Sequence, residues 1–119
     1  MPFEQHKEKN YSKDVQSIYQ AGESAMQKLD GKIISSSPEQ FQFTARFPKV
    51  VLGKTLGERT ELSLAVRADG EGGIAVVDAF PLDVLERKLM FGARPGVTLT
   101  VVTWFIAYLE NALGLPPSK

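Results

Sequence analysis

The 119-residue sequence contains no cysteine and a single histidine, and its 14 acidic side chains balance its 14 basic ones. Without cysteine there is no disulfide, no thiolate nucleophile and no cysteine-ligated metal, and the chain suits a reducing compartment. The one histidine, His6, lies in a polar N-terminal stretch where we expect it to be solvated. Because triads and common zinc sites need histidine, the sequence favours a non-enzyme without metal or cofactor.

The chain also lacks a long hydrophobic run. Its longest uncharged apolar stretch, residues 95–109, has about 15 residues and includes three threonines, whereas a bilayer span needs roughly 20 mostly apolar residues. The polar N-terminus has no apolar segment of the signal-peptide kind. We therefore expect a cytoplasmic, soluble protein with one domain at 11–115, a flexible tail at 1–10 and a short tail at 116–119.

The most apolar part of the chain is the predicted helix at 97–113. On a helical wheel its apolar side chains cover about twice the roughly 100° stripe of an ordinary surface helix. The strip left for water carries few side chains: Thr100, Thr103, Ala107, Glu110 and Asn111. Three explanations fit this width: the helix rests on another helix as well as on a sheet, it lines a ligand cavity, or it pairs with a second subunit.

The rest of the chain predicts one helix followed by strands. A helix begins near Ser12, with Asp14 in its first turn, and Gly31 ends it with a left-handed cap. Alternating apolar residues predict an antiparallel sheet with one buried face. The expected strands are 32–37, 41–47, 50–52, 60–68 and 74–80, followed by a short helix at 82–90.

These elements predict an α+β fold in which an N-terminal helix and a long C-terminal helix pack on one face of a four- to five-stranded antiparallel meander. The expected order is one helix, five strands and two helices. This order and the wheel pattern resemble the helix-grip folds, including the Bet v 1-like lipid-binding domains and the TBP-like domains. The chain departs from the Bet v 1-like form in having fewer strands and no long N-terminal strand. The resemblance transfers no site residues.

Asp78 is the candidate for a buried acid. It shares its strand parity with Ile74 and Val76, so burial of that face would demand a cationic partner or a raised pKa, as at a catalytic or ligand-anchoring site. If Ala75 and Val77 face inward instead, Asp78 lies in water. The pattern favours this second arrangement, because small residues pack well beneath helices.

The basic residues Arg46, Lys49, Lys54 and Arg59 cluster in sequence, opposed by Glu58 alone. A surface for single-stranded nucleic acid would need aromatic side chains interleaved with these charges. The nearby phenylalanines have the parity of core residues instead. We interpret the cluster as a solvated edge that discourages strand pairing, and we expect no nucleic-acid partner.

The helix at 97–113 provides the leading functional hypothesis, which is a non-catalytic binding or assembly module. Its broad apolar face would meet a protein partner or a second copy of the chain. The alternative is a carrier of a small apolar, lipid-like ligand in a cavity between helix and sheet; an enzyme that uses a buried aspartate is the least favoured. The predicted binding residues are Val97, Val101, Trp104, Phe105 and Tyr108.

Overall fold

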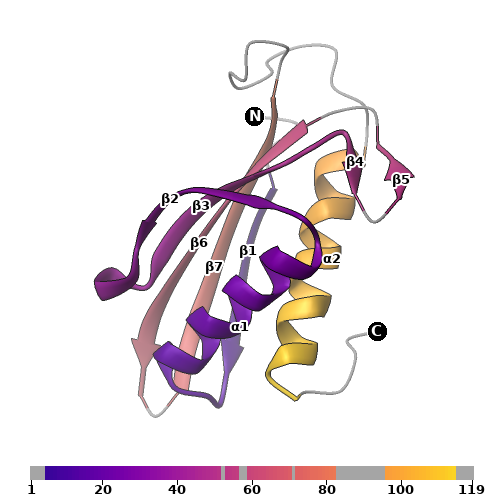
Figure 1. Ribbon diagram of the computed structural model, residues 1–119. Helices are drawn as coiled ribbons and strands as arrows, with labels where there is room; N and C mark the ends of the chain where they lie inside the picture. The colour runs from indigo at the N-terminus through magenta and orange to yellow at the C-terminus, as the bar shows by residue number, and fades with distance from the viewer. Residues whose placement is uncertain (1–4, 52, 57–58, 71, 83–95, 115–119) are drawn as a thin grey trace.

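The computed structural model describes residues 5–51, 53–56, 59–70, 72–82 and 96–114, which form an α+β architecture. A five-stranded antiparallel sheet carries two helices on one face (Figure 1), as the sequence predicts. None of the helices in this part of the chain is long and apolar enough to cross a membrane. The elements are β1 (Gln5–Tyr11), α1 (Val15–Lys28), β2 (Lys32–Ser37), the 3-10 helix η1 (Pro38–Gln40), β3 (Gln42–Phe47), β4 (Val50–Val51), β5 (Lys54–Thr55), β6 (Arg59–Asp69), β7 (Gly72–Leu82) and α2 (Val97–Ala112).

The strands follow the order β1-β7-β6-β3-β2, and every neighbouring pair is antiparallel. Strands β2, β3, β6 and β7 form the predicted meander. The β4–β5 hairpin is inserted between β3 and β6 as a separate two-stranded sheet. The meander places the beginning of β2, the end of β3 and the beginning of β6 at the same end of the sheet.

The prediction of a flexible tail at 1–10 is wrong for the residues that the structure describes. Gln5–Tyr11 forms β1, an edge strand paired with β7 from Gln5 opposite Ala79 to Tyr11 opposite Gly73. Edge strands commonly carry charged side chains, and β1 has no apolar alternation to reveal it. The described part of the fold therefore begins with a strand, not a helix. The sequence predicts no N-terminal strand, which would be a difference from the Bet v 1-like form, and β1 removes that difference.

The inner face of the sheet carries the apolar residues that the alternation predicts. In β7 the inward set is Ala75, Val77 and Ala79, which leaves Asp78 on the outer face. Ala68 is exposed, although it shares its parity in β6 with the buried Leu64 and Val66. The shared core also includes the buried side chains of the two helices and of β3 and β6: Ile18, Ala25, Met26, Leu29, Phe43, Ala45, Phe47, Leu62, Leu64, Val66, Val101, Val102, Phe105 and Leu109.

Both ends of α1 differ in detail from the prediction. Asp14, not Ser12, is the N-cap, and its carboxylate accepts hydrogen bonds from the backbone and hydroxyl of Ser17. At the other end Asp30, with φ 61°, adopts the left-handed conformation that Gly31 was expected to adopt. Gly31 is needed for space, because a Cβ there would lie 2.1 Å from the Met26 sulfur.

The connections also refine the predicted strand ends. Phe41 lies outside β3 in a left-handed conformation, and Lys54–Thr55, expected to be loop, forms β5. Pro81, expected to close the last strand, lies within β7 opposite Thr60. Leu82 ends β7, so the predicted helix at 82–90 does not begin there. The rest of that predicted helix lies outside the described residues.

Candidate functional site

Helix α2 carries all five predicted binding residues, and the structure divides them into two groups. Val101 and Phe105 are 1% and 0% exposed, and the Phe105 ring packs edge-to-face on Phe43 with centroids 6.3 Å apart. Val97 is also buried. Trp104 and Tyr108, one turn apart, are half-buried. Only this second pair offers substantial surface to another molecule.

The breadth of the apolar face of α2 is explained mainly by α1. The two helices lie side by side on the sheet, and α2 also contacts β7, β6 and β1 (Figure 1). The first of the three explanations therefore accounts for most of the apolar arc. The arc is not completely covered, because Leu99 remains 41% exposed and Ile106 is half-buried.

The β4–β5 hairpin lies beside the N-terminal end of α2 (Figure 1). Val51 anchors it in the core at 1% exposure, and the Leu56 amide donates a 2.7 Å hydrogen bond to the Lys49 carbonyl. The Lys54 ammonium nitrogen lies 5.9 Å from the centroid of the Trp104 ring, within the range of a cation–π contact. We call Val50, Lys54, Trp104 and Tyr108 the hairpin–helix surface; Val50 is 48% exposed.

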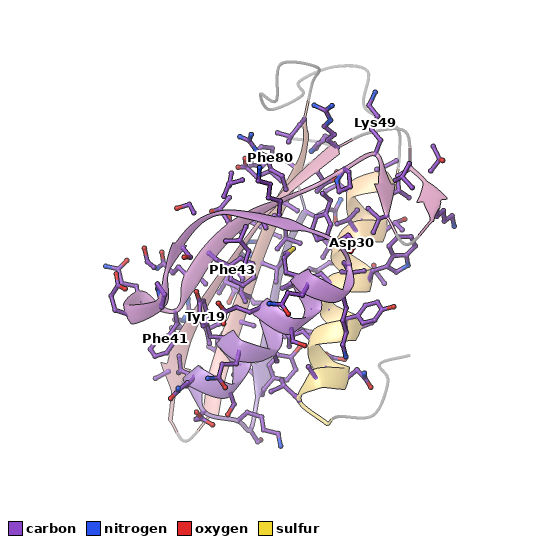
Figure 2. The ribbon with its side chains drawn as sticks, viewed as in Figure 1. Tyr19, Asp30, Phe41, Phe43, Lys49 and Phe80 are labelled. Atoms are coloured by element: carbon purple, nitrogen blue, oxygen red, sulfur yellow. The ribbon has the colours of Figure 1, made fainter. Side chains whose placement is uncertain are left out.

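Side chains fill the space between the helices and the middle of the sheet. A Cβ on Gly22 of α1 would lie 2.4 Å from Leu64, with Phe43 and Phe105 also in contact. Tyr19 stacks edge-on against both Phe41 and Phe43 at 5.9 and 5.8 Å (Figure 2). This region is therefore a packed core and leaves no room for a ligand beside Gly22.

One buried polar side chain in the described part of the chain has no hydrogen-bond partner. Thr60 is 0% exposed and lies on β6 between Phe47 of β3 and Pro81 of β7. Its hydroxyl oxygen finds no donor or acceptor among the described residues. Buried hydroxyls are normally paired, so this group is a candidate contact for a molecule that reaches the inner face.

Glu110 was expected in the water-facing strip of α2, and this prediction is wrong. The residue is 6% exposed, its carboxylate accepts a 2.8 Å hydrogen bond from the Tyr11 hydroxyl, and the Lys9 ammonium lies 4.0 Å away. Burial, together with the adjacent Glu110 carboxylate, raises the pKa of Tyr11 well above its usual value. Edge strand β1 supplies both partners and thus covers this side of α2.

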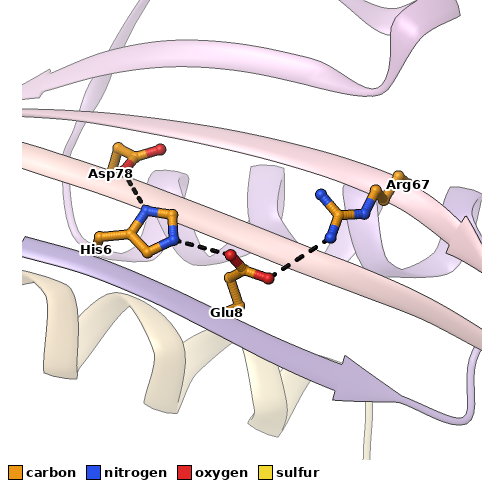
Figure 3. A network of polar contacts seen from close by, with 4 residues as sticks. All are labelled: His6, Glu8, Arg67 and Asp78. Carbon is orange, nitrogen blue, oxygen red and sulfur yellow. Dashed lines mark hydrogen bonds and ion pairs between the residues drawn. The ribbon is translucent and has the colours of Figure 1, made fainter.

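The outer face of the sheet carries a polar network that the sequence did not reveal. His6 of β1 places Nδ1 2.5 Å from Asp78 of β7 and Nε2 3.0 Å from Glu8, and Glu8 also pairs with Arg67 at 3.6 Å (Figure 3). The hydrogen bond to Asp78 is the largest of the effects that raise the pKa of His6. His6 is therefore not simply solvated, and Asp78 is an exposed partner of His6, not a buried acid.

This network does not have the arrangement of a catalytic triad. Both nitrogens of the His6 ring contact carboxylates, and neither contacts a hydroxyl group that could act as a nucleophile. The neighbouring Ser63 shares a 3.1 Å hydrogen bond with Thr44. Within the residues that the structure describes, no group of three or more acidic, histidine or cysteine side chains is placed to hold a metal ion. The contact between His6 and Asp78 links β1 to β7.

No protein-family model and no curated protein matches the chain. Solved structures do match. Ara h 8.0201 aligns with a TM-score of 0.65 and 10% identity, covering 93% of this chain and 97% of its own. TTHA0849 from Thermus thermophilus has a TM-score of 0.47 and 12% identity, over 92% of this chain and 96% of its own. A DUF4468 family protein from Bacteroides ovatus has a TM-score of 0.48 and 14% identity, over 98% of this chain and 88% of its own.

At such identities the likeness establishes the fold alone. Ara h 8.0201 has the Bet v 1-like helix-grip fold, in which a long C-terminal helix lies on a curved antiparallel sheet. The N-terminal strand, the meander and α2 correspond to that description. The chain therefore has a helix-grip-like fold.

Proposed function

We propose that this protein is a non-catalytic binding module whose recognition site is the hairpin–helix surface. The observation that carries the proposal is the half-buried Trp104, held between the body of α2 and the ammonium group of Lys54. Tryptophan is enriched among the residues that dominate protein–protein binding energy. Here it is the only tryptophan of the chain, and a partner would complete its burial.

Charge identifies the kind of partner that would fit. The segment from Pro48 to Gly57 contains Lys49 and Lys54 and no acidic residue. Both lysines are exposed, and Lys49 lies at the base of the hairpin (Figure 2). A partner that presents an apolar side chain next to a carboxylate would pack on Trp104 and pair with Lys54. We commit to a protein segment of this chemistry as the occupant.

Selection from a random peptide library against the purified protein tests this proposal. We expect the recovered peptides to share an aromatic or aliphatic residue beside an acidic one. By calorimetry, Trp104→Ala should weaken their binding about tenfold or more, as at an interface hot spot, and Lys54→Gln about twofold to fivefold. Two variants on the outer face of the sheet, away from α2, serve as matched controls and should bind normally: Val76→Ala and Arg67→Gln.

Two outcomes would contradict the proposal. Equal affinity of the peptides for the wild-type protein and Trp104→Ala would place the site elsewhere. Light scattering would show whether a second copy is the occupant instead. A dimer that dissociates on Trp104→Ala would assign the surface to self-association and overturn the assignment to a different protein.

A second candidate function, the carriage of a small apolar ligand, is favoured by Thr60. Its unpaired hydroxyl on the inner face would gain a hydrogen bond from a polar group on an otherwise apolar ligand. Thermal shifts with a panel of fatty acids and sterols test this function. We expect any stabilisation to decrease in Thr60→Val, which keeps the shape and removes the hydroxyl. No stabilisation by any panel member would count against the carrier.

A further inference from the structure

A second surface lies at the end of the sheet where β2 begins, β3 ends and β6 begins. It is a cleft of about 340 Å³, within the roughly 300–1,000 Å³ of small-molecule sites. Three different strands contribute its cations, Lys32, Arg46 and Arg59, and Asp30 adds one carboxylate. Its apolar wall consists of Ile34, which is 43% exposed, together with Phe47 and Pro48. A cleft with both cations and an accessible apolar wall suits an amphipathic anion.

The strand register places two of these cations directly against each other. Lys32 and Arg46 are Cα partners across β2 and β3, and like charges in this position destabilise a sheet. Glu61 offsets part of the repulsion by accepting a 3.1 Å hydrogen bond from Arg46 Nε, which also fixes the guanidinium in place. Lys32 forms no ion pair with any described residue. An anion bound in the cleft would pair with Lys32 and remove the remaining repulsion.

Asp30 gives the cleft a second unusual feature. It occupies the left-handed position after α1, where glycine is the common residue, and its exposed side chain lines the cleft. A carboxylate here opposes anion binding by the cations. Asp30 therefore tunes the affinity of the site downward, and replacing it with glycine suits the backbone conformation.

We propose that this cleft binds a small anion that carries an apolar group. The anionic part pairs with Lys32 and the two arginines, and the apolar part rests on Ile34 and Pro48. The site is separate from the hairpin–helix surface, since none of its lining residues belongs to that surface. Either proposal stands if the other one fails.

Phenyl phosphate is a suitable probe, followed by amide chemical shifts in a titration of the full chain. We expect shifts at β2, the end of β3 and the start of β6. Inorganic phosphate should bind more weakly than phenyl phosphate, and benzyl alcohol should not bind. Higher salt should weaken the binding of both phosphates, because their pairing with exposed cations is screened.

Two substitutions in the cleft should have opposite effects. Lys32→Gln should weaken phenyl phosphate binding about twofold to fivefold, and Asp30→Gly should strengthen it by about the same factor, the range of a single surface charge. Lys7→Gln on β1 makes the same charge change outside the cleft and should have no effect. The proposal is overturned if Lys32→Gln and Lys7→Gln bind equally, if inorganic phosphate binds as tightly as phenyl phosphate, or if the shifts map elsewhere.

Discussion

The two faces of the sheet are built on different principles. The inner face is apolar, and its residues pack against α1 and α2 through apolar contacts. The outer face is held by specific polar pairs: His6 with Asp78, Arg46 with Glu61 and Thr44 with Ser63. Burial stabilises the inner face through area removed from water, whereas exposed charge pairs add little stability. The inner face therefore sets the fold, and the outer face fixes details such as the attachment of β1.

The difference in stability between the two faces should be largest at Phe105, which is fully buried against the inner face. Phe105→Ala should lower the free energy of unfolding by about 3–5 kcal/mol, because the cavity lies between α2 and Phe43. Val76→Ala, on the outer face, should cost about 1 kcal/mol or less. Denaturant unfolding measures both. Equal losses would mean that the two faces do not differ as described.

Gly22 tests how tightly α1 closes on that face. Gly22→Leu should lower the free energy of unfolding by about 3 kcal/mol, because the new side chain overlaps Leu64 and meets Phe43 and Phe105. The atoms that approach Gly22 all belong to side chains. Gln20→Leu, at an exposed position of the same helix, is the control and should be nearly neutral. An unchanged denaturation midpoint for Gly22→Leu would show that the helix sits further from the sheet.

Glu110 is the polar exception on α2. Glu110→Ala should cost about 1–3 kcal/mol, because the Tyr11 hydroxyl then loses its partner in a partly buried setting. Glu110→Gln keeps an acceptor for that hydroxyl and should cost less. Thermal unfolding of the two variants measures the difference. A silent Glu110→Ala would contradict the contact between α2 and β1.

The smallest expected effect on stability comes from His6, which lies on the outer face. An NMR titration should place its pKa above the ordinary histidine value of 6.5, and Asp78→Asn should bring the pKa back toward 6.5. Because the folded-state pKa is raised, the stabilisation is fully present below pH 6.5 and is lost as the pH rises through the folded-state pKa. The protection factors of the β1 amides, which correct for the intrinsic rise of exchange with pH, should fall over the same interval. A pKa at or below the ordinary value would contradict the network.

The sequence predicted the inner face well and the outer face poorly, and the reason is physical. Alternation is a local signal, so the inward positions of Phe43, Leu62 and Leu64 follow from two-residue periodicity alone. The broad apolar arc of α2 likewise predicted more than one covering layer, and α1 supplies one. Asp78 followed the arrangement that the pattern favoured, with the small residues of β7 facing inward.

The polar contacts depend on pairings that local patterns do not contain. His6 meets Asp78 across 72 positions, and Tyr11 meets Glu110 across 99. Strand β1 carries no apolar alternation, so nothing in its own sequence distinguishes it from a solvated tail. Once β1 is placed beside β7, the positions of His6 and Tyr11 follow from the register. The surroundings of Trp104 could not be predicted from α2 alone either, because Lys54 approaches its ring from a separate segment, the hairpin.

Acrylamide quenching of Trp104 tests the proposed recognition site most directly. The chain has one tryptophan, so its fluorescence reports on the hairpin–helix surface alone. We predict that the free protein is quenched readily and that a bound library peptide protects the indole. Unchanged quenching at saturating peptide would contradict the account, because the partner would then bind without covering Trp104.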